Sequence, residues 1–192
     1  MSIEPEVEQG SVTETDTRAL SSVVREIRWW ARDVFFAVGT AIMIVVFLYQ
    51  PVKVEGTSML PELVDQERIF VNKFVYRIER IGRGDIVVFW YPKDPTKSYI
   101  KRVIGMPGET VEIRHGIVYV NDKPLDEPYV TPQFTDIRSF KPEIVEPGYY
   151  YVLGDHRNQS NDSRMWGQVP EKYIYGKAVF RYWPMNKMGS LD

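Results

Sequence analysis

A serine on an irregular turn and a lysine on a predicted strand are the residues of this chain best suited to chemistry. Ser58 lies in the run Gly56-Thr57-Ser58-Met59-Leu60-Pro61. Gly56 permits a backbone conformation that other residues resist, and Pro61 fixes its own φ and interrupts regular pairing. Such a turn can present a serine hydroxyl. The same residues also suit an ordinary loop between a helix and a strand, and this stretch alone leaves both interpretations open.

Lys101 is the candidate base for Ser58. On a strand over Ser98–Ile104, Lys101 and Arg102 lie on opposite faces, and both faces carry apolar or aromatic neighbours. At least one of the two side chains must therefore point inward, at least in part. Burial lowers the pKa of a lysine amine from about 10.4 towards neutrality, whereas arginine stays protonated. A neutral Lys101 amine beside Ser58 would accept its proton, which is Ser-Lys acyl-transfer chemistry.

Other catalytic chemistries have weaker support in the sequence. Cysteine is absent, which excludes disulfides, thiolate ligands and a cysteine nucleophile. The two histidines, His115 and His156, lie in polar turns without a partner at metal-ligand spacing, so we expect no metal and no cofactor. A Ser-His-Asp triad through His156 stays open by counting alone. Gly82 and Gly84 lack the third glycine and the helix of a phosphate-binding loop.

Length and charge bound the organisation of the chain. The 192 residues, 44% hydrophobic, suit one globular domain with an appendage. The net charge is −2, and no basic patch indicates a nucleic-acid partner.

The appendage is N-terminal. Residues 1–33 are predicted to be a disordered cytoplasmic tail, acidic at first and basic at its end. Residues 34–50 carry no charge, and a helix of that length rises about 25 Å, close to the bilayer core of about 30 Å. They predict a single transmembrane anchor. A buried helix of a soluble domain and a cleaved signal peptide are the alternatives, but the run is apolar on every face and no small-x-small site follows it.

The charges that flank this run predict its orientation. Arg25, Arg28 and Arg32 precede it, and only Lys53 follows closely. The positive-inside rule places the N-terminus in the cytoplasm and residues 51–192 on the exported side. Whether the membrane is a plasma or a thylakoid membrane is not determined by the sequence.

The exported domain is predicted to be mainly β, an antiparallel sheet or barrel-like catalytic domain. Short β-branched and aromatic runs alternate with turn signals such as Pro107-Gly108. About residues 109–148 are predicted to form an inserted hairpin and loop subdomain, with a hairpin turn at His115-Gly116 and a proline-rich stretch after it. The predicted strands are Arg68–Asn72, Asp85–Tyr91, Ser98–Ile104, Thr110–Arg114, Gly116–Val120, Tyr149–Leu153 and Ala178–Tyr182.

Four blocks, in this order, make the chain resemble bacterial-type signal peptidase I, a membrane-anchored serine protease that removes signal peptides from exported preproteins. The similarity spans about residues 34–185. The blocks are Gly56-Thr57-Ser58-Met59-Leu60-Pro61, Arg83-Gly84-Asp85-Ile86-Val87-Val88-Phe89, the segment from Tyr99 to Gly108, and the segment from Gly154 to Arg164, which continues into Trp166-Gly167-Gln168-Val169-Pro170.

The resemblance implies a role for each matching residue. Ser58 is implied to be the nucleophile and Lys101 its general base. Ser160 is implied to orient the Lys101 amine by a hydrogen bond. Asp162 and Arg164 are implied to form an ion pair that holds their loop against the catalytic strand.

The chain departs from the family pattern at several positions. Some members carry a hydroxyl residue two before the nucleophile that donates to the oxyanion, but Gly56 has no side-chain donor. The backbone N–H of Ser58 is therefore expected to serve, and a second donor is undetermined. Glu62, His156 and Gln159 replace the usual residues, and we expect these changes to affect loop packing only.

The resemblance implies cleavage of preproteins at small-x-small sites at the membrane surface, with the lipid bilayer and preproteins as partners. Two rivals stay open on the sequence. One is a Ser-Lys autoprotease or amidase on a related fold, and the other is a membrane-tethered binding module in which Ser58 is only a turn residue.

Overall fold

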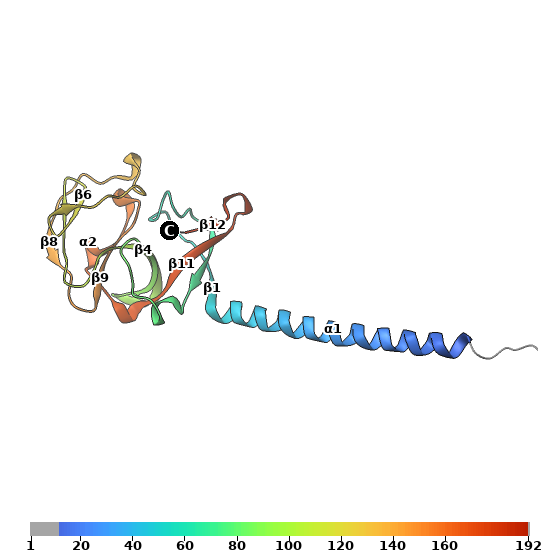
Figure 1. The fold of residues 1–192 in the computed structure, drawn as a ribbon. Helices are drawn as coiled ribbons and strands as arrows, with labels where there is room; N and C mark the ends of the chain where they lie inside the picture. The colour runs from blue at the N-terminus through green and yellow to red at the C-terminus, as the bar shows by residue number, and fades with distance from the viewer. Residues whose placement is uncertain (1–11, 192) are drawn as a thin grey trace, which may run out of the picture. The chain divides into compact units, whose positions relative to one another are not determined.

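The computed structural model describes residues 12–191, except for the side chains of residues 12–24 and 44–47. The chain divides into two compact units, residues 1–47 and residues 48–192. A single long helix dominates the first unit, and the second contains the strands (Figure 1).

Helix α1 spans Val12–Leu48 and is longer at its N-terminal end than the predicted anchor over 34–50. It begins inside the segment predicted as a disordered tail, because Ala, Leu, Arg and Glu are frequent between residues 18 and 32 and favour helix. Residues 1–11 of that tail lie outside the described part. Among the described residues, no helix is long and apolar enough to cross a membrane. The transmembrane anchor therefore stays a prediction.

The predicted anchor also extends two residues too far at its C-terminal end. Tyr49 and Gln50 belong to strand β1, Tyr49–Lys53, and pair with Asn72 and Val71. Pro51 explains the change, because a proline disfavours the α conformation at the residue before it and cannot continue a helical ladder.

The second unit confirms the predicted mainly β, antiparallel fold. Eight strands form one sheet in the order β1-β2-β11-β3-β4-β9-β10, with β12 beside β11. Four further strands form a smaller sheet in the order β7-β6-β5-β8. After β1, the strands are β2 Arg68–Asn72, β3 Ile86–Tyr91, β4 Asp94–Gly105, β5 Thr110–Arg114, β6 Ile117–Val120, β7 Lys123–Pro124, β8 Phe140–Ile144, β9 Tyr149–Leu153, β10 Val169–Pro170, β11 Ile174–Trp183 and β12 Gly189–Ser190.

All seven predicted strands are present, and three of them have the predicted bounds. Strands β4 and β11 are longer than predicted. The pattern missed β1, β7, β8, β10 and β12, because most of these are short and all five contain a proline or a glycine, which weakens a strand signal. The short helices are η1 Val75–Arg77, η2 Pro132–Phe134, η3 Arg157–Gln159, α2 Ser163–Trp166, η4 Glu171–Tyr173 and η5 Met185–Lys187.

The smaller sheet lies within residues 109–148. Its first hairpin joins β5 to β6 at His115 and Gly116, whose φ angles of 50° and 84° suit the tight turn that the sequence predicted. In Figure 1 this sheet, labelled at β6 and β8, lies across the domain from β11 and β12. Its core contains Ile104 of β4 and Leu153 of β9, so the smaller sheet packs against these two strands of the larger sheet.

Gly105 lies where the two sheets meet, and it has no room for a side chain. A Cβ there would overlap the side chain of Val111 and lie 2.9 Å from Val145 Cγ2. We expect Gly105→Ala to lower the free energy of unfolding by about 2 kcal/mol, because overpacked cores force their neighbours to move. Urea unfolding of the full chain in detergent measures the change. Gly189→Ala is the control, since a Cβ there meets nothing within 4 Å. Equal stability of the two variants would contradict the prediction.

Candidate active site

Ser58 lies on a turn that the chain closes tightly between β1 and β2. Backbone hydrogen bonds join Val54 N to Glu67 O at 2.8 Å and Gln66 N to Val54 O at 2.9 Å. Gly56 has a φ of 89°, the left-handed conformation that the sequence predicted for it. Buried Met59 anchors the turn in the core. Ser58 itself is half-buried, so its hydroxyl is presented at the surface of a fixed turn.

The turn is also tied to strand β11 by charge. Arg181 Nη2 lies 3.2 Å from Glu62 Oε1, and Arg181 Nη1 lies 3.2 Å from the buried Glu67 carboxylate. Glu62, which we expected to affect loop packing only, therefore helps to hold the turn against the sheet.

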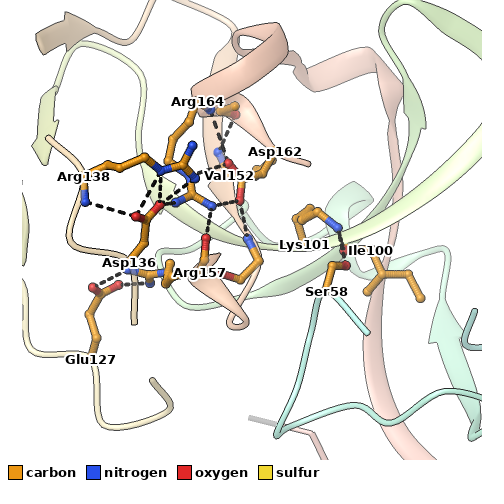
Figure 2. A network of polar contacts seen from close by, with 12 residues as sticks. Ser58, Ile100, Lys101, Glu127, Asp136, Arg138, Val152, Arg157, Asp162 and Arg164 are labelled. Carbon is orange, nitrogen blue, oxygen red and sulfur yellow. Dashed lines mark hydrogen bonds and ion pairs between the residues drawn. The ribbon is translucent and has the colours of Figure 1, made fainter. Parts of the chain in front are cut away.

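Lys101 reaches Ser58 from strand β4 of the same sheet. It pairs with Val87 in the β3–β4 ladder, and its side chain is buried, with 4% of its surface exposed. Its Nζ lies 2.6 Å from Ser58 Oγ and donates to Ile100 O at 2.9 Å. The structure thus brings together two residues that are 43 positions apart in the sequence (Figure 2).

Burial lowers the pKa of the Lys101 amine from 10.5 to about 8. The cause is mainly loss of water around the charged form, opposed by the negative charges of Asp162 and Asp155 and aided by the positive charge of Arg164. Near pH 8 half of the molecules therefore hold a neutral amine at hydrogen-bond distance from the serine hydroxyl.

Arg102 is buried too, although the sequence required only one of the two side chains to point inward. Its Nε and Nη2 donate to the two carboxylate oxygens of Asp155 at 3.0 and 2.8 Å. Its Nη1 donates to Gly84 O at 2.9 Å. A bidentate pair of this kind compensates the buried charge, and it fixes the start of the loop 154–164 on strand β4.

Gly154 lets this loop approach the nucleophile closely. Its N–H donates to Asp162 Oδ2 at 3.1 Å. A Cβ on Gly154 would overlap both Ser58 O and Ser160 Oγ, so only glycine fits there. The loop backbone therefore lies directly against the backbone of the Ser58 turn.

His156 is a site residue that the sequence analysis underrated. Its backbone N–H donates to Ser58 O at 3.1 Å, and its imidazole Nδ1 lies 3.0 Å from Thr57 O. The imidazole thus contacts the backbone of the turn, whereas Lys101 contacts the Ser58 hydroxyl. The structure does not form the triad through His156. His156 holds the turn in place, and its position directly after Asp155 in the fourth block was the available signal.

Asp162 and Arg164 form the expected ion pair. Arg164 Nε and Nη2 donate to Asp162 Oδ1 and Oδ2, each at 2.8 Å, and both side chains are buried. Asp162 also caps α2 by accepting from Arg164 N at 3.3 Å. In Figure 2 Asp162 lies between Arg164 and the Ser58–Lys101 pair.

Ser160 differs from its predicted role. Its Oγ is buried and has no hydrogen-bond partner among the described residues, so the expected bond to the Lys101 amine is absent. The amine instead uses Ser58 Oγ and Ile100 O. The bond to Ser160 was expected from the family resemblance, and a main-chain carbonyl as partner leaves no trace in the sequence.

The predicted oxyanion donor also fits the turn. Gly56 N–H donates to Asp65 Oδ1 at 2.8 Å and is therefore occupied. The Ser58 N–H makes no hydrogen bond to another residue of the described part, which leaves it available to an incoming oxygen.

A cleft of about 670 Å³ opens beside the Ser58 hydroxyl. The cleft is lined by residues 52–59 and 97–101, together with Val88, Tyr175, Gln159 and Asn161. Gln159, expected to act in loop packing only, faces this cleft. Within residues 12–191, no group of three or more acidic, His or Cys side chains is placed to hold a metal ion.

Known proteins match this chain over most of its length. The family model described as "Signal peptidase, peptidase S26" matches residues 27–183. A "Signal peptidase I" of Leptolyngbya laminosa is 36% identical over 195 residues, covering 97% of this chain and 93% of that protein. A "Signal peptidase I" of Bacillus amyloliquefaciens is 39% identical over 191 residues, covering 94% and 96%.

A solved structure is also similar. The crystal structure of a signal peptidase I from Enterococcus faecalis V583 has a TM-score of 0.48 and 32% identity, and the match covers 53% of this chain and 99% of that one. The family match covers well over half of this chain, and the two relatives cover nearly all of it. The chain therefore belongs to the signal peptidase I family, the serine peptidases of family S26.

Proposed function

We propose that this peptidase removes signal peptides from exported preproteins by acyl transfer through a dyad of Ser58 and Lys101. Membership of the signal peptidase I family supports the reaction and the substrate class. The observation that carries the dyad is the 2.6 Å distance between the buried Lys101 Nζ and Ser58 Oγ. A buried amine beside a serine hydroxyl argues against the non-catalytic binding module.

The reaction follows from the positions of these groups. The neutral Lys101 amine accepts the Ser58 proton while Oγ attacks the scissile carbonyl carbon. The Ser58 N–H donates to the oxygen that becomes negative. Collapse of this intermediate breaks the C–N bond, and the protonated Lys101 gives its proton to the leaving amine. A water molecule, deprotonated by Lys101, then hydrolyses the acyl-enzyme and restores both side chains.

The cleft supports recognition of an extended substrate at small-x-small sites. Two of the chain segments that line it, residues 52–57 and 97–101, carry backbone donors and acceptors. A peptide that adds as a strand between them presents every second side chain to the same face. The two small residues of a small-x-small site then face the cleft wall together, and the residue between them faces away.

The proposal includes an anchor over residues 34–48 and a cytoplasmic N-terminus. Tethering the domain to the bilayer that holds the signal peptide would raise the effective concentration of the substrate at Ser58. The apolar run and the arginines that precede it support this placement.

Loss of either dyad residue should abolish cleavage. We expect Ser58→Ala and Lys101→Met each to reduce kcat by at least about 10³-fold on a preprotein in detergent, because each removes a group that the reaction needs. Lys93→Met and Ser139→Ala, exposed positions away from the cleft, should retain the wild-type kcat. A dyad variant with wild-type kcat would exclude the proposed mechanism.

The pH dependence of cleavage should follow the Lys101 amine. Because the neutral amine is the active form and its pKa is about 8, kcat/KM should rise with pH, reach half its maximum near pH 8 and level off above it. Initial rates on a peptide substrate between about pH 6 and pH 10 measure the profile, within the range where the wild type stays folded. A rate that falls as pH rises through 8 would show that the protonated amine is the active form.

The orientation can be tested with single cysteines, because the chain has none. We expect Asp122→Cys in the exposed β6–β7 turn to react with a membrane-impermeant maleimide added outside intact cells that produce the protein. Ser2→Cys should react only after the membrane is opened. Reaction of Ser2→Cys in intact cells would reverse the proposed orientation.

A further inference from the structure

The loop 154–164 is held from a second side by the chain between β7 and β8. Glu127 in this segment pairs with Arg157, whose Nη1 donates to Glu127 Oε2 at 2.9 Å, and Arg157 Nη2 contacts the other carboxylate oxygen. The two side chains are 10% and 3% exposed, so the pair is shielded from water. Tyr129 OH donates to the same carboxylate at 2.8 Å and fixes its orientation.

Asp136 makes the second contact of this kind. Its Oδ2 accepts from Arg164 Nη1 at 2.9 Å, with side chains 9% and 2% exposed. Between these two carboxylates, the ring of Phe134 packs on the ring of His156 with centroids 4.4 Å apart. Three points of one segment therefore contact three residues of the loop (Figure 2 shows the two charged contacts).

We propose that Glu127 and Asp136 are positioning residues for the nucleophile, and that the segment 127–136 holds the loop 154–164 in place. This inference rests on the proposed role of Ser58. It gives a function to the proline-rich part of the insertion, whose role the sequence leaves undetermined.

The contacts run without a gap from each carboxylate to Ser58. Arg157 Nε donates to Gly154 O at 3.1 Å. Arg164 binds Asp162, and Asp162 Oδ2 accepts from Gly154 N. Arg157 therefore holds the carbonyl of Gly154 directly, and Arg164 holds its N–H through Asp162. Gly154 packs directly against Ser58 O, and His156 N–H donates to that same oxygen.

The carboxylates of Glu127 and Asp136 compensate the buried positive charges of Arg157 and Arg164. Each guanidinium is almost fully buried, and a buried cation that loses its partner must regain water or another anion. Arg157 forms no ion pair with a second carboxylate in the described part, and the nearby charge of Asp155 is already paired with Arg102, so its loop would have to open towards solvent. Arg164 would keep Asp162 and would be released less completely.

The test uses the full chain in detergent with Glu127→Gln and Asp136→Asn, which preserve side-chain shape. We expect kcat on a peptide substrate to fall at least about tenfold in Glu127→Gln and less in Asp136→Asn, with KM within about twofold, because small displacements of a reacting group cost rate. The backbone amides of Gly154 and His156 should exchange hydrogen with solvent faster in both variants, as measured by NMR.

Two controls separate positioning from general stability. Asp122→Asn removes a carboxylate in the β6–β7 turn, where Asp122 is 88% exposed and pairs with Arg114 at the surface. This variant should change neither kcat nor the amide exchange rates. Asp136→Glu keeps the charge and should recover most of the rate. Where a carboxamide variant does not fold, Phe134→Leu removes the ring contact on His156 and should show the same joint loss of kcat and protection.

The proposal is overturned if folded Glu127→Gln keeps the wild-type kcat, or if kcat falls while Gly154 and His156 keep their protection. If the proposed Ser58–Lys101 dyad is wrong, Ser58→Ala will retain activity, and this outcome is distinct from the two results above. Amide exchange requires no catalysis and is measured in either case.

Discussion

The buried amine of Lys101 is the constraint on which the site depends. An ammonium group with 4% exposure has lost most of its water, so its neutral form becomes accessible near pH 8. That same loss of water makes the amine sensitive to every charge nearby. Asp162 and Asp155 favour the protonated form and Arg164 opposes it. The proton affinity of the proposed base is therefore set by the ions of the loop 154–164 as well as by burial.

These ions are compensated in pairs, which keeps their influence on Lys101 moderate. Arg102 binds Asp155, Arg164 binds Asp162 and Asp136, and Arg157 binds Glu127. Buried pairs of this kind contribute little net stability, yet breaking one leaves a charge without a partner. Their value lies in geometry. The Arg102 pair joins the loop 154–164 to β4, the Glu127 and Asp136 pairs join it to the segment 127–136, and the Asp162–Arg164 pair fixes the loop internally.

The nucleophile is fixed by backbone contacts more than by its own side chain. Ser58 O accepts from His156, and the absent Cβ of Gly154 lets the loop lie against it. The turn is closed behind by the pairs between Val54 and residues 66–67. A serine held this way can keep its hydroxyl free for Lys101 and its N–H free for an oxyanion. The proposed chemistry thus uses a rigid turn, and substrate binding has little to reorganise.

The sequence by itself determined the seven longer strand signals, the special turn at Gly56 and the pairing of a candidate nucleophile with a candidate base. These follow from local rules, namely side-chain alternation, glycine and proline conformations, and the ease with which lysine loses a proton. Tertiary structure decided which partner the Lys101 amine uses. Its partner Ile100 O is a main-chain carbonyl, and because every residue has one, the sequence does not mark it. Tertiary structure also decided that Arg102 is buried beside Lys101, that His156 holds the turn and that Glu127 and Asp136 reach the loop. Such contacts join residues about 30 to 100 positions apart, and no local pattern encodes which distant carboxylate or carbonyl will meet a given side chain.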